Sequence, residues 1–356
     1  MHHVPLHRLF TTVAIVAAVI VSCFGHLAPV RAQDTKPVRV YILAGQSNMQ
    51  GHAKVGLLQR QIDAEETRDM FAHLHEHGQW VVREDVWVRS GNRAGNLSVG
   101  WGAGPGAIGP ELAFGRTMGD HYEDQQVLLI KTAWGGKSLA RDFLPPSAMP
   151  SEQELDAMHE LAQEQARQRN RNVPTRDQFV AQFGANYRQM LKEVNETLEN
   201  LGERFPDYQG QGYELAGFVW FHGWNDHLSA GFRAAYAENM AHFIRDVRRD
   251  LEAPELPFVI GQFGVGGMAP NSNVVELKEA QAQAASLPEF QGNVKLVPTD
   301  VYWDTRADEV FRRGWQQNLE EWNRVGSDRP YHYLGSVVFF TQAGDAFAKG
   351  MIELEK

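Results

Sequence analysis

The feature that most constrains the fold of this chain is an alternation of short, continuous apolar runs with longer amphipathic stretches. The apolar runs, rich in Val, Ile and Phe, predict strands at residues 38–44, 126–132, 214–221, 257–262 and 294–298. The stretches between and after them have helical patterns, near residues 57–77, 109–120, 176–203, 230–251, 273–286, 308–323 and 335–354. Strands that are apolar along their whole length, alternating with helices, predict an α/β protein whose five-stranded, mainly parallel sheet is covered by helices on both faces.

One stretch between the predicted strands has a different composition. Residues 151–175 are charged, rich in glutamine and poor in large apolar side chains. This composition is typical of a solvated helix, inserted between sheet elements or covering one rim of a site. Because no low-complexity linker divides the rest of the chain, we expect one folded domain over residues 36–355 that carries this insertion.

The N-terminus has the pattern of a targeting segment. Residues 9–24 are apolar, follow a weakly basic start, and lead to small residues suited to cleavage after Ala32. This pattern predicts a secretory signal peptide over residues 1–32, and therefore export to the periplasm or the extracellular space. A second interpretation stays open, because the segment IVSC resembles a lipoprotein processing site. Lipidation of Cys23 would then anchor the protein to a membrane.

Composition excludes several classes of partner. Cys23 is the only cysteine, so the folded domain has no internal disulfide and depends on its core for stability. The net charge of −10 and the pI near 5.8 argue against nucleic acid or an anionic membrane surface as a partner. No second long apolar segment follows the N-terminal one, and the sequence leaves the oligomeric state open.

Polar or glycine-rich segments follow three of the predicted strands, and a fourth such segment precedes the last predicted helix. They are GQSNM at 45–49, TAWGGKS at 132–138, WFHGWND at 220–226 and SDRPYHY at 327–333. In open parallel sheets, functional sites lie beyond the carboxyl ends of the strands. We therefore expect these segments to meet in one site.

The segments together hold the groups that acyl transfer needs. Ser47 is the candidate nucleophile, and a serine requires a nearby base, for which His332 is the candidate. The developing oxyanion needs donors, and the N–H groups of Ser47 and Gly135 and the amide of Asn225 can supply them. The order of the segments and their placement at strand ends favour a serine hydrolase.

Three of these segments resemble the motifs of a known family. "GQSNMQG", "AWGGKSL" and "GWND" are similar to the serine, glycine and asparagine blocks of the SGNH hydrolases, in the branch of sialate O-acetylesterases and related carbohydrate acetylesterases. The resemblance spans residues 38–354. It implies a three-layer α/β/α, flavodoxin-like fold, a serine nucleophile, an acetylated carbohydrate as the substrate, and deacetylation without a metal or other cofactor.

The sequence departs from this resemblance at two places. The third block reads His-Gly-Trp-Asn where the branch more often has a Gln-Gly-Glu type, which leaves the sugar class open. The family's aspartate three residues before the histidine is replaced by Arg329, and Asp328 stands one residue earlier. We assign Asp328 as the acid of the triad, with Asp304 and Asp300 as the alternatives.

Further residues near the four segments are candidates for substrate contact. They are Gln46, His52, Trp134, Arg141, His222 and Trp224. Aromatic side chains such as Trp134 and Trp224 suit a sugar, whose C–H faces pack on flat rings. A glycine-rich segment at 104–109 is expected to form part of the site rim, whereas the histidines of "HLHEH" lack the partners of a zinc site.

The predicted function is thus an exported serine esterase that removes acetyl groups from a carbohydrate. Two alternatives stay open. One is a broad lipase-like or thioesterase activity within the same superfamily, which would need a wide apolar groove. The other is a sugar-binding protein that has kept the hydrolase fold and lost catalysis.

Overall fold

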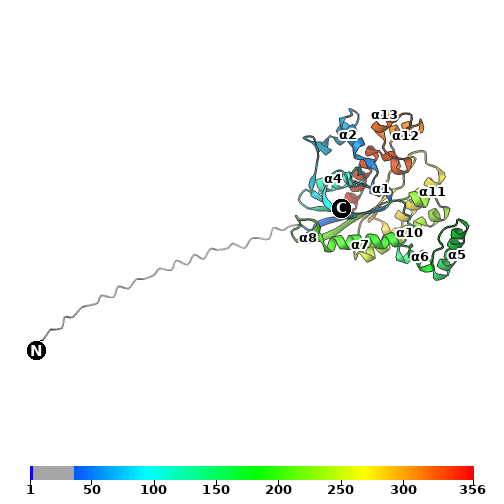
Figure 1. Ribbon diagram of the computed structural model, residues 1–356, viewed down its shortest axis with the longest axis horizontal. Coiled ribbons are helices and arrows are strands. Elements are labelled where there is room, and N and C mark those ends of the chain that lie inside the picture. The colour runs from blue at the N-terminus through cyan, green and yellow to red at the C-terminus, as the bar shows by residue number, and fades with distance from the viewer. Residues whose placement is uncertain (3–35) are drawn as a thin grey trace. The chain divides into compact units, whose positions relative to one another are not determined.

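The computed structural model describes residues 1, 2 and 36–356, so the apolar part of the predicted signal peptide, Cys23 included, lies outside the described residues. Residues 36–356 form one compact unit (Figure 1). Within them, no helix is long and apolar enough to cross a membrane.

A seven-stranded sheet is the centre of this unit, with the strand order β11-β10-β9-β1-β8-β5-β6. Its strands are β1 (Val38–Gly45), β5 (Arg83–Ser90), β6 (Arg93–Leu97), β8 (Val127–Ala133), β9 (Tyr213–Phe221), β10 (Phe258–Gln262) and β11 (Val294–Pro298). All neighbouring pairs are parallel except β5 and β6, which form an antiparallel hairpin at one edge. Two short pairs lie outside the sheet: β2 (Ala53–Lys54) with β7 (Ala107–Ile108), and β3 (His75–Glu76) with β4 (Gln79–Trp80).

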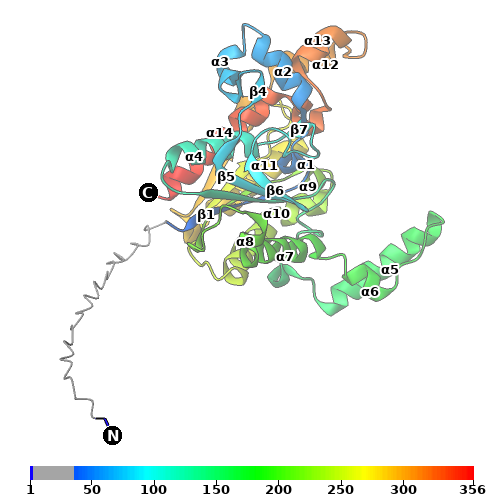
Figure 2. The same cartoon turned by 60° about the vertical axis from the view of Figure 1, so that its left-hand side comes forward.

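Helices cover both faces of the sheet and make a three-layer α/β/α architecture. On one side lie α4 (Glu111–His121) and α14 (Val337–Leu354), and on the other lie α7 (Ala185–Glu199) and α10 (Ala230–Asp250) (Figure 2). The remaining α-helices are α1 (Ser47–Gln50), α2 (Val55–Asp63), α3 (Arg68–Phe71), α5 (Glu152–Gln168), α6 (Arg176–Val180), α8 (Leu201–Arg204), α9 (Trp224–His227), α11 (Ser272–Ala285), α12 (Thr305–Arg312) and α13 (Leu319–Val325). The core is packed from the strands that are covered on both faces, because their side chains are buried whichever way they point.

The three central strands end at the same level. In the parallel register, Gly45 at the end of β1 lies beside Ala133 of β8 and beside Phe221 of β9. Gly45 has a φ of +151°, and a Cβ there would lie 2.2 Å from the Phe221 carbonyl oxygen, so only glycine fits. The chain segments that leave these three strands therefore start side by side.

All five predicted strands are present within a residue of the predicted bounds, but the expected number of strands was too small. The segment missed is the hairpin of β5 and β6. It is missing from the prediction because "REDVWVRS" and "RAGNL" carry charged, glycine and asparagine residues instead of a continuous apolar run. Arg89 of β5 is nevertheless buried, since it pairs with the carboxylate of Glu193 on α7.

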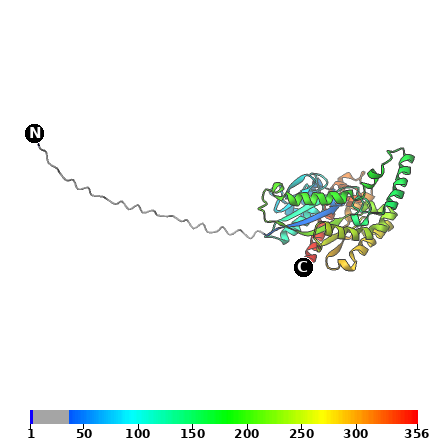
Figure 3. The ribbon, with the colours of Figure 1, turned by 90° about the horizontal axis from the view of Figure 1, so that it is seen from below.

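Several predicted helices are divided. The stretch 57–77 contains α2, α3 and a short 3-10 turn, and the stretch 308–323 contains α12 and α13. The charged stretch at 151–175 contains α5, and α6 follows directly after it; the two helices project from the rest of the unit, as Figures 2 and 3 show from two directions. Leu155 on α5 makes a small separate core with Leu144 and Phe183, which holds this projection to the body.

Candidate active site

The chain leaves β1 and places Ser47 at the first residue of the single-turn helix α1. Ser47 is 7% exposed, and its neighbours Gln46 and Asn48 are buried almost completely. The Asn48 amide donates to the Tyr331 carbonyl at 3.2 Å, which ties the serine loop to the segment that holds His332. The opening "GQSN" thus forms a buried, braced turn that leaves one hydroxyl at the surface of a cavity.

That cavity has a volume of about 370 Å³ and is called the serine cavity below. It is lined by Ser47, Gln50, His52, Gly135, Gly136, Trp224, Asn225, Tyr331 and His332. The residues predicted as nucleophile, base and oxyanion donors therefore face one space. Within residues 36–356, no hydrogen bond ties the Ser47 hydroxyl to another group, so it is free to meet a ligand.

His332 lies on a tight bend that precedes α14. Tyr333 and Leu334 have φ values of +49° and +62°, and the Leu334 N–H donates back to the Arg329 carbonyl at 2.9 Å. The buried Tyr333 hydroxyl accepts a hydrogen bond from the Gly264 N–H at 2.9 Å, which fixes the bend to the body. Two consecutive non-glycine residues in the left-handed region are unfavourable, and the surrounding contacts hold them there.

This bend brings Asp328 to His332 although the spacing is four residues and not three. Asp328 Oδ2 lies 3.2 Å from His332 Nδ1, so Nε2 is left for the serine cavity. The alternative acids are occupied elsewhere. Asp304 caps α12 and accepts from the Ser336 hydroxyl at 2.5 Å, and Asp300 pairs with Lys278.

His52 shares the same carboxylate. Its Nδ1 lies 3.5 Å from Asp328 Oδ2, and its ring lies parallel to that of His332 with centroids 3.9 Å apart. Burial alone would raise the pKa of Asp328. The two neighbouring imidazoles and the Arg329 N–H, which donates to Oδ1 at 2.6 Å, outweigh burial and hold this pKa well below its usual range.

His52, Asp328 and His332 also form a set of possible metal ligands, with one ligand atom of each within 4.8 Å of the others. An imidazole nitrogen binds a metal in the plane of its ring. The two rings are stacked at an angle of 13°, so their planes do not converge on one point. The stacked rings therefore do not offer two nitrogens to one metal ion.

Donors for an oxyanion surround Ser47. A Cβ built on Gly135 would lie 3.6 Å from Ser47 Cβ, so the glycine backbone approaches the serine closely. The N–H groups of Ser47 and Gly135 have no hydrogen-bond partner in residues 36–356. Asn225 donates one amide hydrogen to the Gly136 carbonyl at 3.0 Å, which orients the side chain and leaves its second hydrogen toward the serine cavity.

Asp226 joins the asparagine block to the glycine block. Its buried carboxylate accepts from the N–H groups of Leu139 at 2.9 Å and Ala140 at 3.0 Å. Burial raises the pKa of Asp226 to about 7, against the lowering effect of these two hydrogen bonds. Asp226 thus fixes the loop that carries Gly135 relative to Asn225.

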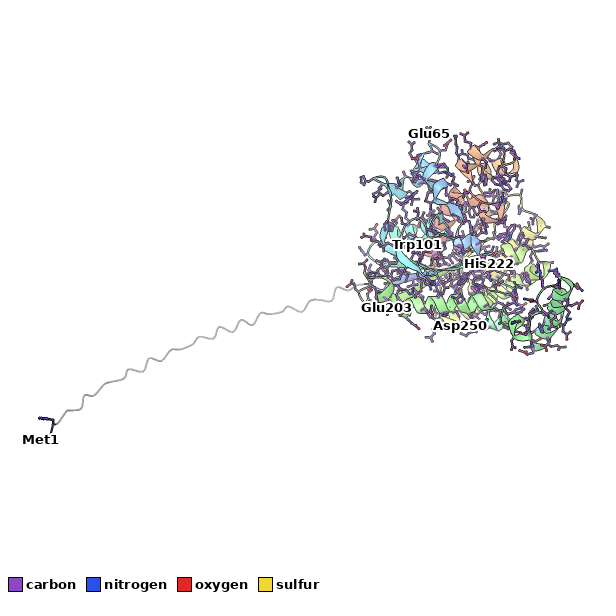
Figure 4. All side chains as sticks on the ribbon, viewed as in Figure 1. Met1, Glu65, Trp101, Glu203, His222 and Asp250 are labelled. Carbon is purple, nitrogen blue, oxygen red and sulfur yellow. The ribbon has the colours of Figure 1, made fainter. Side chains whose placement is uncertain are left out.

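His222 does not line the serine cavity, which corrects the expectation of a substrate contact. It is 1% exposed and lies within the body of the protein (Figure 4). Its Nε2 donates to the Lys137 carbonyl at 2.9 Å, and its Nδ1 lies 3.3 Å from the Tyr236 hydroxyl. Burial lowers the pKa of His222 to about 4, so the ring is neutral near pH 7.

The other predicted contacts divide into two groups. Trp224 and His52 do line the serine cavity. Gln46 does not, because it is buried and accepts the Asn225 N–H at 3.4 Å; Arg141 also lies outside, beside Asp142. Trp134 faces a neighbouring cavity instead.

Three cavity residues lay outside the predicted set, namely Gln50, Gly136 and Tyr331. Tyr331 packs against the ring of Trp224, with centroids 5.4 Å apart, and also against His332 at 4.5 Å. Its position next to the predicted base in the sequence was the signal that could have identified it.

A serine, two oxyanion candidates and a histidine thus line one cavity beyond the carboxyl ends of a mainly parallel sheet that lies between helical layers. The sequence profile described as "carbohydrate esterase, sialic acid-specific acetylesterase" matches residues 37–302. The chain belongs to this family and is a carboxylic ester hydrolase. The matched region ends before Asp328 and His332.

Comparison with a solved structure from Arabidopsis thaliana agrees on the fold. A protein from Arabidopsis thaliana is 16% identical with a TM-score of 0.51, over 89% of this chain and 98% of that one. A carbohydrate acetylesterase from Xanthomonas citri is 12% identical with a TM-score of 0.43, over 88% of this chain and 55% of that one. NanS is 12% identical with a TM-score of 0.42, over 74% and 78% of the two chains. A search of curated proteins found no match.

Proposed function

We propose that this protein removes O-acetyl groups from a carbohydrate through a covalent acetyl-serine intermediate. The observation that carries the proposal is the convergence of Ser47, His332, Gly135 and Asn225 on one cavity, with Asp328 at 3.2 Å behind the histidine. The description of the family adds the acetyl ester and the sugar.

In the first half of the reaction, His332 Nε2 takes the proton of the Ser47 hydroxyl as Oγ attacks the acetyl carbonyl carbon. The negative oxygen of the tetrahedral intermediate accepts hydrogen bonds from the N–H groups of Ser47 and Gly135 and from the Asn225 amide. Asp328 holds the imidazole in the tautomer with hydrogen on Nδ1 and stabilises the imidazolium. The C–O bond to the sugar then breaks, and His332 returns its proton to the sugar oxygen.

In the second half, a water molecule attacks the acetyl-serine with His332 again as the base. The same donors hold the second oxyanion, and acetate leaves as Ser47 recovers its proton. Trp224 and Tyr331 form an aromatic wall of the cavity, on which the C–H face of a sugar ring can pack.

The experiment that tests this proposal is acetate release from 4-nitrophenyl acetate, acetylated xylan and O-acetylated sialic acid, with the protein compared with Ser47→Ala. We expect the substitution to remove activity on every ester by about 10⁴-fold or more. Sugar binding without turnover of any ester would contradict the proposal and favour the non-catalytic alternative. Hydrolysis that survives in Ser47→Ala would exclude Ser47 as the nucleophile.

Export belongs to the same proposal, with residues 1–32 as a cleaved signal peptide. The test is N-terminal sequencing of the protein expressed with residues 1–32 in a bacterial host with Sec and lipoprotein machinery. A mature chain in the soluble exported fraction that starts after residue 32 supports cleavage there. A lipid-modified chain that starts at Cys23 and sediments with membranes would replace this interpretation by the anchored one.

A further inference from the structure

A second cavity, of about 310 Å³, lies next to the serine cavity and is called the hairpin cavity below. Gln50 lines both cavities. The other walls come from the turn of the β5–β6 hairpin, the glycine-rich loop at 102–105, the end of β8, and Glu193 on α7. Trp134 belongs to the hairpin cavity and directly precedes Gly135 of the serine cavity, so a ligand on Trp134 is adjacent to the candidate oxyanion site.

The buried charges in the walls of the hairpin cavity are neutralised inside the protein. Lys131 is 3% exposed and donates to the carboxylate of Glu111 at 2.6 Å. Glu193 is 8% exposed and pairs with the buried guanidinium of Arg89, while Gln189 donates to its second oxygen at 2.8 Å. The cavity is therefore polar, yet these walls present no unpaired charge, which suits a ligand that carries hydroxyl groups.

Arg93, at the turn of the hairpin, supplies the exposed donors. One of its nitrogens donates to the Gly100 carbonyl at 2.7 Å, and its guanidinium lies 4.8 Å above the ring of Trp101. In residues 36–356, no carboxylate pairs with Arg93. The side chain is thus held in place by Trp101 and Gly100 while its other N–H groups are available to a ligand.

A wide polar cavity is unsuited to the acyl group of an acetyl ester, because a methyl group needs only a small apolar space. The alcohol part of the substrate is the polar, bulky part. A partly exposed indole ring, a fixed guanidinium and neighbouring polar groups are the elements that bind a sugar: its C–H face packs on the ring and its hydroxyls accept and donate.

We propose that the hairpin cavity binds the sugar unit next to the one that carries the acetyl group, so that the enzyme prefers oligosaccharides or polysaccharides to single sugars. This inference rests on the proposed function. It assigns Trp134 and Arg93 to the second sugar and the aromatic pair Trp224 and Tyr331 to the first.

The test compares substrates that differ by one or more sugar units. The pairs are acetylated xylotetraose with methyl acetylxyloside, and O-acetylated sialyllactose with free O-acetylated sialic acid. We expect kcat/KM for the longer member of at least one pair to exceed that of the shorter by about tenfold or more. In Arg93→Gln the ratio of kcat/KM for the longer substrate to kcat/KM for the shorter one falls by about tenfold. The reason is that the substitution removes a charge-assisted hydrogen bond to the second sugar, which the shorter substrate lacks.

Asn92→Ala, in the same exposed turn, is a second variant of the hairpin cavity. Arg306→Gln is the matched control, because it makes the same change of side chain at a residue that lines neither cavity. Thermal unfolding of each variant shows whether it is folded. Equal kcat/KM for the long and short members of both pairs would overturn the inference. So would an unchanged ratio in folded Arg93→Gln and Asn92→Ala.

A binding measurement separates failure of this inference from failure of the proposed function. Calorimetric titration with acetyl-free xylotetraose and sialyllactose reports on the hairpin cavity without any ester bond. If the wild type hydrolyses none of the esters but binds an oligosaccharide, and this binding weakens about tenfold in Arg93→Gln, the catalytic proposal is overturned and the sugar site is supported. Ester hydrolysis that depends on Ser47, with no binding of either oligosaccharide, would overturn the sugar site alone.

Discussion

The rings of His52 and His332 lie parallel, with centroids 3.9 Å apart, and their Nδ1 atoms face the same oxygen of Asp328. Both imidazoles therefore contact the carboxylate that is proposed to orient the base. From this relationship we infer a task for His52 other than the substrate contact expected from the sequence, namely to position Asp328 and to support one face of the His332 ring.

Replacement of His52 distinguishes these two tasks. If His52 positions the triad, His52→Phe lowers kcat by about tenfold on 4-nitrophenyl acetate as well as on sugar esters, with little change in KM, because Asp328 loses its polar contact with the His52 imidazole. His52→Asn, whose side-chain amide can donate toward Asp328, restores part of kcat. A raised KM confined to sugar esters, with normal hydrolysis of 4-nitrophenyl acetate, would return His52 to the role of substrate contact.

The identity of the triad acid leads to a second prediction. Asp328→Asn leaves the shape of the site intact but favours the wrong tautomer of His332, so we expect kcat to fall by about 10³–10⁴-fold. Asp304→Asn is the matched comparison, because this aspartate caps α12 and contacts Ser336. Because asparagine caps a helix about as well as aspartate, only the hydrogen bond from Ser336 is affected, so we expect a loss of about 1 kcal/mol or less in stability and an unchanged kcat. Both variants are measured by steady-state kinetics and thermal unfolding. A large fall in kcat for Asp304→Asn with a normal kcat for Asp328→Asn would exclude Asp328 as the acid of the triad.

Asn225 is predicted to act on the transition state. Asn225→Ala removes one candidate oxyanion donor, and we expect kcat to fall by about 10²–10³-fold with a small change in KM. The variant also frees the Gly136 carbonyl, to which Asn225 donates at 3.0 Å. Asn225→Asp is isosteric but, when ionised, cannot donate to the oxyanion or to the Gly136 carbonyl and adds a negative charge beside the oxyanion, so we expect a fall in kcat at least as large. A variant with an alanine there and normal kcat would remove Asn225 from the mechanism.

The position of the site could be predicted because it depends on strand ends. Continuous apolar runs identified β1, β8 and β9, and parallel strands that are neighbours necessarily present their carboxyl ends at one edge. Ser47, Gly135 and Asn225 then had to be close. The hairpin of β5 and β6 followed no such pattern, since Arg89 is buried only by virtue of a partner on α7 that is far away in sequence.

The role of individual polar residues could not be predicted in the same way. His222 and His52 both stand near a site segment, but the direction of each side chain is decided by tertiary contacts. His222 follows the end of β9 and turns inward to the Lys137 carbonyl, whereas His52 turns toward Asp328. Spacing alone also left three aspartates as candidates for the acid of the triad. The bend at Tyr333 and Leu334, which accompanies the separation of four residues between Asp328 and His332, has backbone angles that are rare for these residue types.

The buried His222 predicts how stability changes with pH. Its pKa is lowered by burial from 6.5 to about 4, so the unfolded chain binds the proton more strongly, and the stability that the neutral ring contributes is lost as pH falls from about 6.5 to about 4. At about 1.4 kcal/mol for each pH unit, the loss reaches roughly 3 kcal/mol. Asp226, with a pKa raised to about 7, has the opposite sign: its contribution is full below its ordinary value of 3.8 and is lost as pH rises toward 7.

The comparison with His222→Gln reports on the histidine together with its contact to Asp226, whose Oδ2 lies 3.5 Å from His222 Nε2. Gln can still donate to the Lys137 carbonyl. We expect the stability of the wild type relative to His222→Gln, measured by urea unfolding, to decrease steadily between pH 6.5 and pH 4. A difference that is constant over this range would show that His222 is not neutral and buried in the native state.

Lys131, which forms a buried ion pair with Glu111, also contacts the turn at 47–50 that carries Ser47. Besides its bond to Glu111, the Lys131 ammonium donates to the Gln50 carbonyl at 2.7 Å and to the Trp101 carbonyl at 2.8 Å. Gln50 ends α1, the helix that begins with Ser47. Lys131 therefore holds the turn that carries Ser47, in addition to neutralising a buried carboxylate.

These two effects can be measured apart. Lys131→Met leaves the Glu111 carboxylate buried without its partner, so we expect a loss of about 3–5 kcal/mol in the free energy of unfolding. The double variant with Glu111→Gln removes the unpaired charge and recovers most of that stability, while kcat on 4-nitrophenyl acetate stays low because the Gln50 carbonyl is still released. Lys349→Met, at the exposed pair with Asp345, is the control and costs less than about 1 kcal/mol. Recovery of both stability and kcat in the double variant would show that Lys131 serves the fold alone and leaves the position of Ser47 to other contacts.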